Sequence, residues 1–346
     1  MTLKELAEEI GCSKATLDRA LNNRGKVSEK MMQKILAHVD RLDFQVNGIG
    51  KALAMQNKMK FGIIISADLS SKSNALFQLI YEGMCQGAKS YSSIGAKFFF
   101  IKLSSGRADE QIRAIRSLME KGVAGIAISI EENSQELFDT IDAAMEQGIQ
   151  FISYQNTVGA AIAKNNYRYI MGTDQSKEGH IAAELMGRFL NGRGKVILYS
   201  GLMKNMFHQN RIDSAYEKLK KEYPDIEIVD VFRNAYPDEK ISRDFNNVLD
   251  QHPDLSGVII SCGGDYVVTE VLKGRGLLKQ VKQIMFDVTP KVEEELKAGN
   301  IDVVIGVDLK KLGYNTIVAL CDSLVYGRIE CIKVDLPISI MMKECY

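Results

Sequence analysis

The stretch LKELAEEIGCSKATLDRALNN, residues 3–23, decides the fold of the first part of the chain. Between Leu3 and Ile10, apolar side chains recur at the spacing of one helical face, and Gly11 can end that helix. Ser13 then offers a side-chain cap for a second helix, predicted from Lys14 to about Leu21. Two short helices joined by a tight glycine-containing turn are typical of a helix-turn-helix.

A third helix and an excess of basic residues complete this head. Ser28 can cap the helix, whose apolar stripe consists of Met32, Ile35, Leu36, Val39 and Leu42. Residues 1–60 hold 11 Lys and Arg against 7 Asp and Glu, whereas the whole chain holds 44 of each kind. A basic head on an acidic remainder favours an anionic partner for the head.

The second helix has one apolar and one polar face. Leu17, Ala20 and Leu21 can face the core of the head. The residues left on the opposite face are Lys14, Ala15, Asp18, Arg19 and Asn22. This face suits the major groove of DNA, where Arg19 could bond guanine and Asp18 could accept from cytosine. The alternative is the solvated face of an ordinary three-helix bundle.

From Phe61 the pattern changes to FGIIIS, which indicates a buried parallel strand. Helical stretches separate most of the later strand-like runs. These are KFFFIK from Lys97, GIAIS from Gly125, FISY from Phe151, YIMG from Tyr169, KVILYS from Lys195, GVIIS from Gly257 and QIMF from Gln283. The alternation predicts parallel sheets with helices on both faces. Some ten strands suit two lobes, and residues 160–167 offer a change of sheet without a crossover helix.

Several classes of function lack their signals. The six cysteines are scattered, which indicates reduced thiols without a zinc or disulfide pattern. The first residues do not form a signal peptide, and no run approaches 18 apolar residues, so we expect a cytoplasmic protein with no membrane span. Neither a dinucleotide fingerprint, a phosphate loop nor a nucleophile elbow occurs, so we predict no enzyme, no cofactor and no metal.

The head resembles the DNA-binding region of the lac repressor (LacI/GalR) family almost throughout. The pieces that carry the resemblance are LAEEIGCS, AT-x-x-RALNN, KVSEKM and VNGIGKAL. The resemblance implies base reading by Lys14, Ala15 and Arg19, and phosphate contacts by Thr16 and Asn22. The family often has Ser at the position that Asp18 occupies in this chain. Its hinge helix corresponds to the VNGIGKAL stretch, and Leu53 stands where the family inserts a leucine into the minor groove.

The hinge departs from the family pattern in two ways. Val46 stands where the family usually has Pro, and Gly48 and Gly50 replace residues that favour a helix. Each glycine costs about 1 kcal/mol of helix stability relative to Ala. We therefore expect a hinge that is poorly formed without DNA, and the alternative is a plain flexible linker.

The body resembles type I periplasmic binding proteins, especially the ribose-binding branch. The matching segments are SNALFQLIYEGMCQGAKSY, MGTDQSKEGHIAAELMGRFL, HQNRIDSAYEKL, SCGGDYVVTEVL, IMFDVTPKVEEELKAG and GVDLKKLGYNTIVAL. The resemblance implies a small-molecule effector, a sugar or a related compound. The implied effector-binding residues are Asn74, Phe77, Gln155, Arg211, Asp265 and Asp287.

Two departures concern hydroxyl-binding groups. The sugar-binding branch has an Asp–Arg pair where this chain has Gln155-Asn156, and it has a Gln where this chain has Val307. The effector is therefore expected to be modified, smaller or less polar than ribose. Each implied site residue also has an ordinary structural alternative, such as a helix cap.

The sequence thus predicts a small all-α helix-turn-helix head and an α/β periplasmic-binding-protein-like body of two doubly wound parallel sheets. The predicted boundaries are 1–45 for the head, 46–59 for the hinge and 60–346 for the body. Within the body, lobe 1 is expected at about 60–162 and 290–324, and lobe 2 at about 163–289 and 325–346.

The function this predicts is a ligand-responsive, nucleoid-associated transcription repressor. It would act as a homodimer or a higher oligomer on palindromic operator DNA. The alternatives are a solute-binding protein of a sugar transporter and a sugar-converting enzyme that uses the same cleft.

Overall fold

The computed structural model describes most of the body and part of the head. The described residues are 3–21, 27–28, 31–32, 34–35, 59–69, 75–93, 95–132, 134–155, 169–172, 174–200, 206–233, 238–261, 266–326 and 332–346. The predicted hinge, up to residue 58, lies outside them.

The head begins with α1 (Leu3–Ile10) and α2 (Lys14–Leu21), which confirms both predicted helices. Gly11 lies between them at φ +74°, a conformation that suits glycine. The Ser13 hydroxyl accepts a hydrogen bond from the Thr16 N–H at 3.0 Å, as expected of a helix cap. The core of the head contains Leu6, Ala7, Ile10, Leu17, Ala20 and Ile35, so the part of the predicted apolar faces of α1 and α2 that the structure describes is buried.

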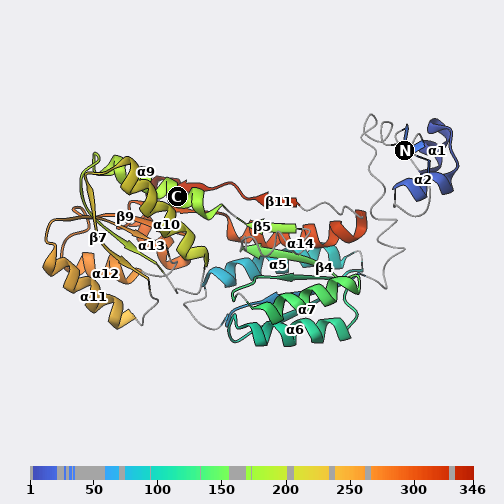
Figure 1. Cartoon of the computed structure of the whole chain (residues 1–346), viewed down its shortest axis with the longest axis horizontal. Helices are drawn as coiled ribbons and strands as arrows, with labels where there is room; N and C mark the ends of the chain where they lie inside the picture. Colours follow the sequence, from blue (N-terminus) through green and yellow to red (C-terminus); the bar gives the residue numbers. More distant parts are fainter. Residues whose placement is uncertain are drawn as a thin grey trace.

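The first lobe is a parallel sheet of the order β11-β5-β4-β3-β1-β2. Its strands are β1 (Lys60–Ile65), β2 (Lys97–Lys102), β3 (Gly125–Ile128), β4 (Gln150–Gln155), β5 (Tyr169–Gly172) and β11 (Ile332–Asp335). One face is covered by α5 (Ala75–Ser92) and α14 (Leu309–Tyr326), and the other by α6 (Ala108–Glu120) and α7 (Gln135–Glu146) (Figure 1).

The second lobe has the sheet order β12-β10-β9-β8-β6-β7, with β12 antiparallel to β10. Its strands are β6 (Gly194–Tyr199), β7 (Ile226–Phe232), β8 (Leu255–Ile260), β9 (Lys282–Phe286), β10 (Val303–Gly306) and β12 (Ser339–Met341). Its helices are α9 (Gln175–Phe189), α10 (Met206–Glu222), α11 (Asp238–Gln251), α12 (Tyr266–Gly274) and α13 (Pro290–Lys297), and a short 3-10 turn, Lys343–Cys345, follows β12.

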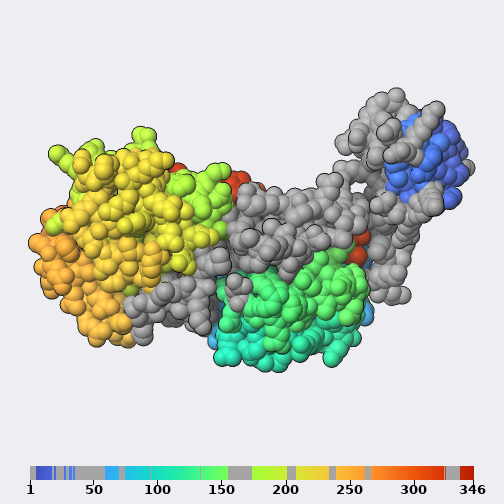
Figure 2. Space-filling model, viewed as in Figure 1, coloured from blue at the N-terminus to red at the C-terminus, as the bar shows by residue number. Residues whose placement is uncertain are grey.

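Each sheet is buried on both faces, which explains the continuous apolar runs of its strands. In β1, Phe61, Ile63 and Ile65 pack on the side of α5 and α14, whereas Ile64 packs on the side of α6 and α7. In the second lobe, α9 and α10 cover one apolar layer, and α11, α12 and α13 cover the other. Figure 2 gives the same view in space-filling form, with the green and teal surface of α6 and α7 on the first lobe.

The predicted lobe boundaries are wrong at three places. β5 pairs with β4, so the chain leaves the first sheet after Gly172 and not near residues 160–167. α13 and β10 belong to the second lobe, because β10 pairs with β9, so the return begins after Gly306. β11 pairs with β5 in the first sheet, so the last crossing falls between Asp335 and Ser339.

Glycines allow two pairs of helices to approach until their backbones touch. A Cβ added at Gly83 of α5 would lie 1.9 Å from the Lys310 carbonyl oxygen of α14, and one at Gly313 would lie 2.0 Å from that of Ile80. A Cβ added at Gly179 of α9 would lie 2.2 Å from the Arg211 carbonyl oxygen of α10. The close approach of α9 and α10 brings charged side chains of both helices together.

Candidate functional site

The carboxyl ends of the strands of the second lobe carry a cluster of buried charges. Open parallel sheets place their ligands at this edge. Asp287 directly follows β9 and has φ +61°, an uncommon conformation for a residue other than glycine. Arg211 lies in the second turn of α10, and its side chain is fully buried.

Arg211 bonds two carboxylates at once. Its Nη1 and Nη2 donate to the two carboxylate oxygens of Asp287, at 2.6 and 3.0 Å, and its Nε donates to Glu178 Oε2 at 2.7 Å. The guanidinium carbon lies 4.6 Å from the centre of the Phe286 ring. This is the bidentate geometry that Arg favours with carboxylates, here between buried side chains.

The protonation state of the buried Arg211 depends on its burial and on its two carboxylate partners. Burial by itself lowers the pKa of the Arg211 guanidinium, but the charges of Asp287 and Glu178 and their hydrogen bonds raise it above its usual value. Arg211 therefore stays protonated between Asp287 and Glu178. Removing one member of such a buried cluster leaves an uncompensated charge.

His208 lies one turn before Arg211 and is neutral. Burial, and then the charge of Arg211, lower the pKa of His208 to about 4, although the hydrogen bond to Ser261 and the charge of Asp287 oppose this. Its Nδ1 lies 2.6 Å from the Ser261 carbonyl oxygen, so Nδ1 carries the hydrogen and donates. The same carbonyl oxygen lies 3.4 Å from Arg211 Nη1.

Ser261 directly follows β8, at the same edge of the sheet. Its side chain is fully buried, and its hydroxyl has no hydrogen-bond partner among the described residues. A buried hydroxyl of this kind can still accept or donate one bond. It therefore stands as a neutral polar group beside the charged triad.

The predicted effector residues divide into three groups. Arg211 and Asp287 are in direct contact. Phe77 is half-buried on α5 in the first lobe, and Gln155 ends β4, although its side chain lies outside the described residues. Asn74 and Asp265 lie outside the described residues altogether.

Sequence reasoning did not single out Glu178 or His208. Glu178 sits in the first turn of α9, directly before the glycine that lets α10 approach. In the sequence, the one signal for Glu178 is that it precedes a glycine within a predicted helix. This signal is weak, because the sequence does not show which helix packs against that glycine. His208 precedes Arg211 by three residues, the spacing of one helical face.

At the corresponding edge of the first lobe, the buried polar groups that the structure describes are neutral. Gln111 Nε2 donates to Ser66 Oγ at 2.7 Å and to the Ser129 carbonyl oxygen at 2.6 Å. The Tyr154 hydroxyl donates to the Ile64 carbonyl oxygen at 2.7 Å. Burial, and then the charge of Glu131, raise the pKa of Tyr154 well above its usual value, so this phenol stays neutral.

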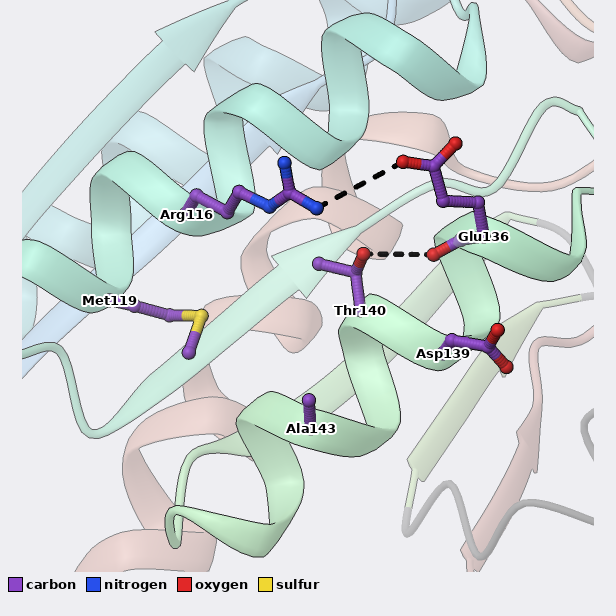
Figure 3. A pocket seen from close by; sticks show the side chains of 6 residues that line it. All are labelled: Arg116, Met119, Glu136, Asp139, Thr140 and Ala143. Carbon is purple, nitrogen blue, oxygen red and sulfur yellow. Dashed lines mark hydrogen bonds and ion pairs between the residues drawn. The ribbon is translucent and has the colours of Figure 1, made fainter.

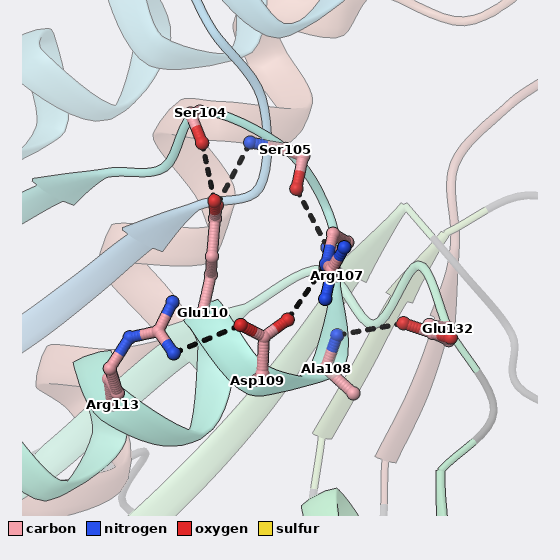
Figure 4. Close-up of polar contacts among 8 residues, drawn as sticks. All are labelled: Ser104, Ser105, Arg107, Ala108, Asp109, Glu110, Arg113 and Glu132. Carbon is pink, nitrogen blue, oxygen red and sulfur yellow. Dashed lines mark hydrogen bonds and ion pairs between the residues drawn. The ribbon is translucent and has the colours of Figure 1, made fainter.

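Charged groups of the first lobe lie at the rim of this edge, in the loop before α6 (Figure 4). Glu132 accepts from the Ala108 N–H at 2.9 Å, and Glu110 accepts from the hydroxyl of Ser104 and from the Ser105 N–H. Hydrogen bonds from Arg107 and Arg113 lower the pKa of the exposed Asp109. These carboxylates hold the start of α6 in place.

A groove of about 310 Å³ lies elsewhere on the first lobe, between α6 and α7 (Figure 3). It is lined by Arg116, Met119, Glu136, Asp139, Thr140 and Ala143. Arg116 and Glu136 face each other across it at 3.9 Å, a weak and exposed ion pair. None of its residues is a predicted site residue.

The predicted DNA-facing side of α2 is exposed where the structure describes it. Lys14, Ala15 and Arg19 are exposed, and Thr16 is half-buried with its hydroxyl 2.8 Å from Ser13 Oγ. Arg19 Nε donates to the Ala15 carbonyl oxygen at 3.0 Å. The side chain of Asp18, and the residues Asn22 and Leu53, lie outside the described residues.

Together these features define a class of protein. A helix-turn-helix precedes an α/β body of two six-stranded sheets, and none of the described helices is long and apolar enough to cross a membrane. The model of the lacI family of bacterial regulatory proteins matches residues 2–47, and the model of the periplasmic binding protein domain matches residues 65–328. The chain belongs to the family of the periplasmic binding protein domain, and its head is similar to the lacI family of bacterial regulatory proteins, as the sequence predicted.

Individual relatives are distant. Catabolite control protein A of Streptococcus mutans serotype c is 30% identical over 127 residues, which are 36% of this chain and 35% of that protein. The ribose operon repressor of Lactococcus lactis subsp. lactis is 23% identical over 258 residues, which are 75% of this chain and 71% of that protein. The first of these matches thus spans about a third of the relative.

A solved structure supports the fold of the body. The sugar-binding protein of a sugar ABC transporter from Bacillus halodurans superposes with a TM-score of 0.70. It is 22% identical and covers 83% of this chain and 98% of its own. At this identity the likeness shows the two-lobed fold alone.

Proposed function

We propose that the protein is a ligand-responsive DNA-binding transcription regulator, and specifically a repressor. The observation that carries this proposal is the presence, in one chain, of a lacI-family head at residues 2–47 and a periplasmic binding protein domain at residues 65–328. An effector that binds differently to two states of the body would change operator affinity by the same coupling free energy. The protein would act in the bacterial cytoplasm.

The effector is proposed to be a sugar or a related polyhydroxy compound, and the regulated genes those for its uptake or breakdown. The names of two similar proteins, a ribose operon repressor and a sugar-binding protein, support this class. On the first lobe, Asn74, Phe77 and Gln155 are proposed to contact the effector, and Asp265 on the second. Arg211 and Asp287 are proposed to shape the floor of the site.

A homodimer on palindromic DNA is part of the proposal. One helix-turn-helix reads only a half-site, and a twofold axis pairs two of them. Lys14, Ala15 and Arg19 would read bases, and Thr16 and Asn22 would contact phosphates. Leu53 would enter the minor groove, and Asp18 would lie on the same face of α2.

The competing proposals make different demands. A solute-binding protein of a transporter has no use for a DNA-binding head, and this chain has one. A sugar-converting enzyme would turn over a bound sugar, and the named relatives in this family are transcription regulators. Neither alternative accounts for the order of head, hinge and body.

Selection of DNA from a random pool by the full-length protein tests the proposal. We expect an enriched palindrome, and we expect Lys14→Ala and Arg19→Ala to reduce affinity for it by about 5- to 150-fold, as for a lost base contact of about 1–3 kcal/mol. Lys343→Ala is the matched control, because Lys343 is exposed at the far end of the chain. A pool that yields no preferred sequence would contradict the proposal.

A further inference from the structure

Three crossing segments carry the chain between the two sheets. The first lies between Gly172, which ends β5, and Gln175, which begins α9. The second follows Gly306 at the end of β10 and leads to α14, which packs on the first lobe. The third lies between Asp335 of β11 and Ser339 of β12. Because these segments join the lobes covalently, a rotation of one lobe against the other must change their backbone angles.

Glu178 connects the first crossing segment to the strand ends of the second lobe. It lies in the first turn of α9, directly after the helix cap, where the Asp174 side chain accepts from the Lys177 N–H at 3.0 Å. Its Oε2 accepts from Arg211 Nε at 2.7 Å, and both side chains are fully buried. Separation of a buried ion pair is costly. The start of α9 is therefore held to α10 at this point.

Asp287 connects the same arginine to the other two crossing segments. Both of its carboxylate oxygens accept from Arg211, at 2.6 and 3.0 Å, and its N–H donates to the Ile305 carbonyl oxygen at 2.8 Å. The next residue, Gly306, lies so close that a Cβ added to it would be 3.2 Å from the Asp287 Cα atom. Ser339 is paired with Gly306 across β10 and β12. One buried arginine is thus connected to the ends of all three segments.

We propose that Glu178 is a positioning residue for the response to the effector: through Arg211 it couples the strand ends of the second lobe to the crossing segments. Effector binding that shifts Asp287 moves Arg211 with it, because two charge-assisted hydrogen bonds join them. Arg211 in turn moves Glu178 and the start of α9. This inference rests on the proposed function, which places the effector at these strand ends. The alternative is that Glu178 contributes to stability alone.

Hydrogen exchange of the full-length protein without any effector tests the connection. We expect Glu178→Ala to speed amide exchange in α9 and also in residues 303–309 and 335–341, by about tenfold or more, because the loss of a buried ion pair makes local opening easier. Exchange in β1 and β3 should stay as in the wild type. Acceleration that is confined to α9 and α10, or that is equal in both lobes, would overturn the inference.

Two further substitutions at the same position separate the contact from the fold. Glu178→Gln keeps an oxygen that can accept from Arg211 Nε, so we expect it to restore most of the slow exchange. Glu178→Asp keeps the charge but shortens the side chain by one methylene, and it should show the pattern of Glu178→Ala even if that variant does not fold. Exchange in Glu178→Asp that matches the wild type at all three crossing segments would contradict the proposal.

Glu184→Ala is the matched control on the same helix. Glu184 is partly exposed and pairs with Arg188 and Lys218 at the surface. Its removal should change exchange in α9 alone, since a surface ion pair contributes little. If Glu184→Ala sped exchange at residues 303–309 and 335–341 as much as Glu178→Ala, the effect would not depend on the buried pair and the inference would fail.

The response to a sugar gives a second test. D-ribose, D-glucose and D-galactose are the probes, and calorimetry identifies any that bind. With a bound sugar at saturation, we expect the change in operator affinity to fall from about 5- to 150-fold in the wild type to less than about threefold in Glu178→Ala, and to return in Glu178→Gln. A role in stability alone would leave this ratio unchanged, because saturation removes any effect on sugar affinity. An unchanged ratio in Glu178→Ala would therefore overturn the inference.

The two tests separate this inference from the proposed function. If a sugar binds to the wild type but leaves its operator affinity unchanged, the proposed regulation fails, and the exchange pattern still decides the role of Glu178. If the sugar changes operator affinity equally in the wild type and in Glu178→Ala, the regulation stands and the inference fails.

Discussion

The two lobes share a topology but treat the carboxyl ends of their strands differently. In the second lobe, a buried arginine bonds two buried carboxylates, Asp287 at the end of β9 and Glu178 in the first turn of α9. In the first lobe, buried Gln111, Ser66 and Tyr154 bond neutral oxygens, and the ion pairs lie at the exposed rim. The comparison shows that one fold can build the same edge from neutral polar groups or from a charged cluster. The charged cluster makes the second lobe the more sensitive of the two to substitution and to pH.

Removal of the central cation should have the largest effect. Arg211→Ala leaves Glu178 and Asp287 buried without a counter-charge, so we expect it to lower the free energy of unfolding by about 3–5 kcal/mol. Urea denaturation of the full-length protein measures this change. Arg113→Ala is the control in the first lobe, because Arg113 pairs with Asp109 on the surface, and it should leave stability nearly unchanged. Equal effects of the two substitutions would break the comparison.

Acid should weaken the second lobe through His208. The pKa of His208 falls from 6.5 to about 4 on folding, so the unfolded chain binds more protons between these two values. Stability contributed by neutral His208 is therefore present above about pH 6.5 and is lost as the pH falls toward 4, by up to about 3 kcal/mol.

A variant isolates this contribution from that of other groups. His208→Asn should flatten the rise of unfolding free energy between pH 4.5 and 7, measured by denaturation at a series of pH values. His180→Asn, at an exposed position of α9, is the control and should leave the slope as it is. If the slope of His208→Asn matches that of the wild type, His208 is not the buried neutral group described here.

A substitution that separates α9 from α10 should weaken the contacts among Arg211, Glu178 and Asp287 without changing any of these three residues. In Gly179→Ala the new Cβ would lie 2.2 Å from the Arg211 carbonyl oxygen, which forces the backbones apart. Overpacking of this kind costs about 1–3 kcal/mol of unfolding free energy. Gly274→Ala is the control, since nothing lies within 4 Å of its Cβ position. A neutral Gly179→Ala would show that Glu178 does not depend on this close approach.

The smallest effect is expected in the first lobe. Tyr154→Phe removes one neutral hydrogen bond to the Ile64 carbonyl oxygen, and such a bond contributes about 1 kcal/mol. Denaturation of this variant beside Arg211→Ala compares the two edges directly. A loss in Tyr154→Phe as large as that in Arg211→Ala would contradict the difference between the lobes.

The alternation of strands and helices was predictable because each strand is a short apolar run between longer helical patterns. The predicted runs from Lys97 to Gln283 all correspond to strands, whereas β7 and β10 to β12 were not singled out. Membership of the sheets was not predictable: β5 and β11 are short, and only their pairing with β4 and with each other places them in the first lobe.

The candidate site was predictable in part. Arg211 and Asp287 were singled out through a resemblance, and the structure brings them within 3 Å of each other. Their relation to Glu178 was not predictable, because it depends on the contact of two helices at Gly179. Sequence reasoning therefore identified residues that take part in the site but assigned Arg211 to the effector before its two carboxylate partners were known.

The central claim is that effector binding in the body changes DNA binding by the head. The most direct test measures the affinity of the full-length protein for its selected palindrome by fluorescence anisotropy, with and without a saturating neutral sugar found by calorimetry. The account predicts a change of about 5- to 150-fold, the range of a typical coupling free energy. An operator affinity that stays the same while the sugar is bound would contradict the account.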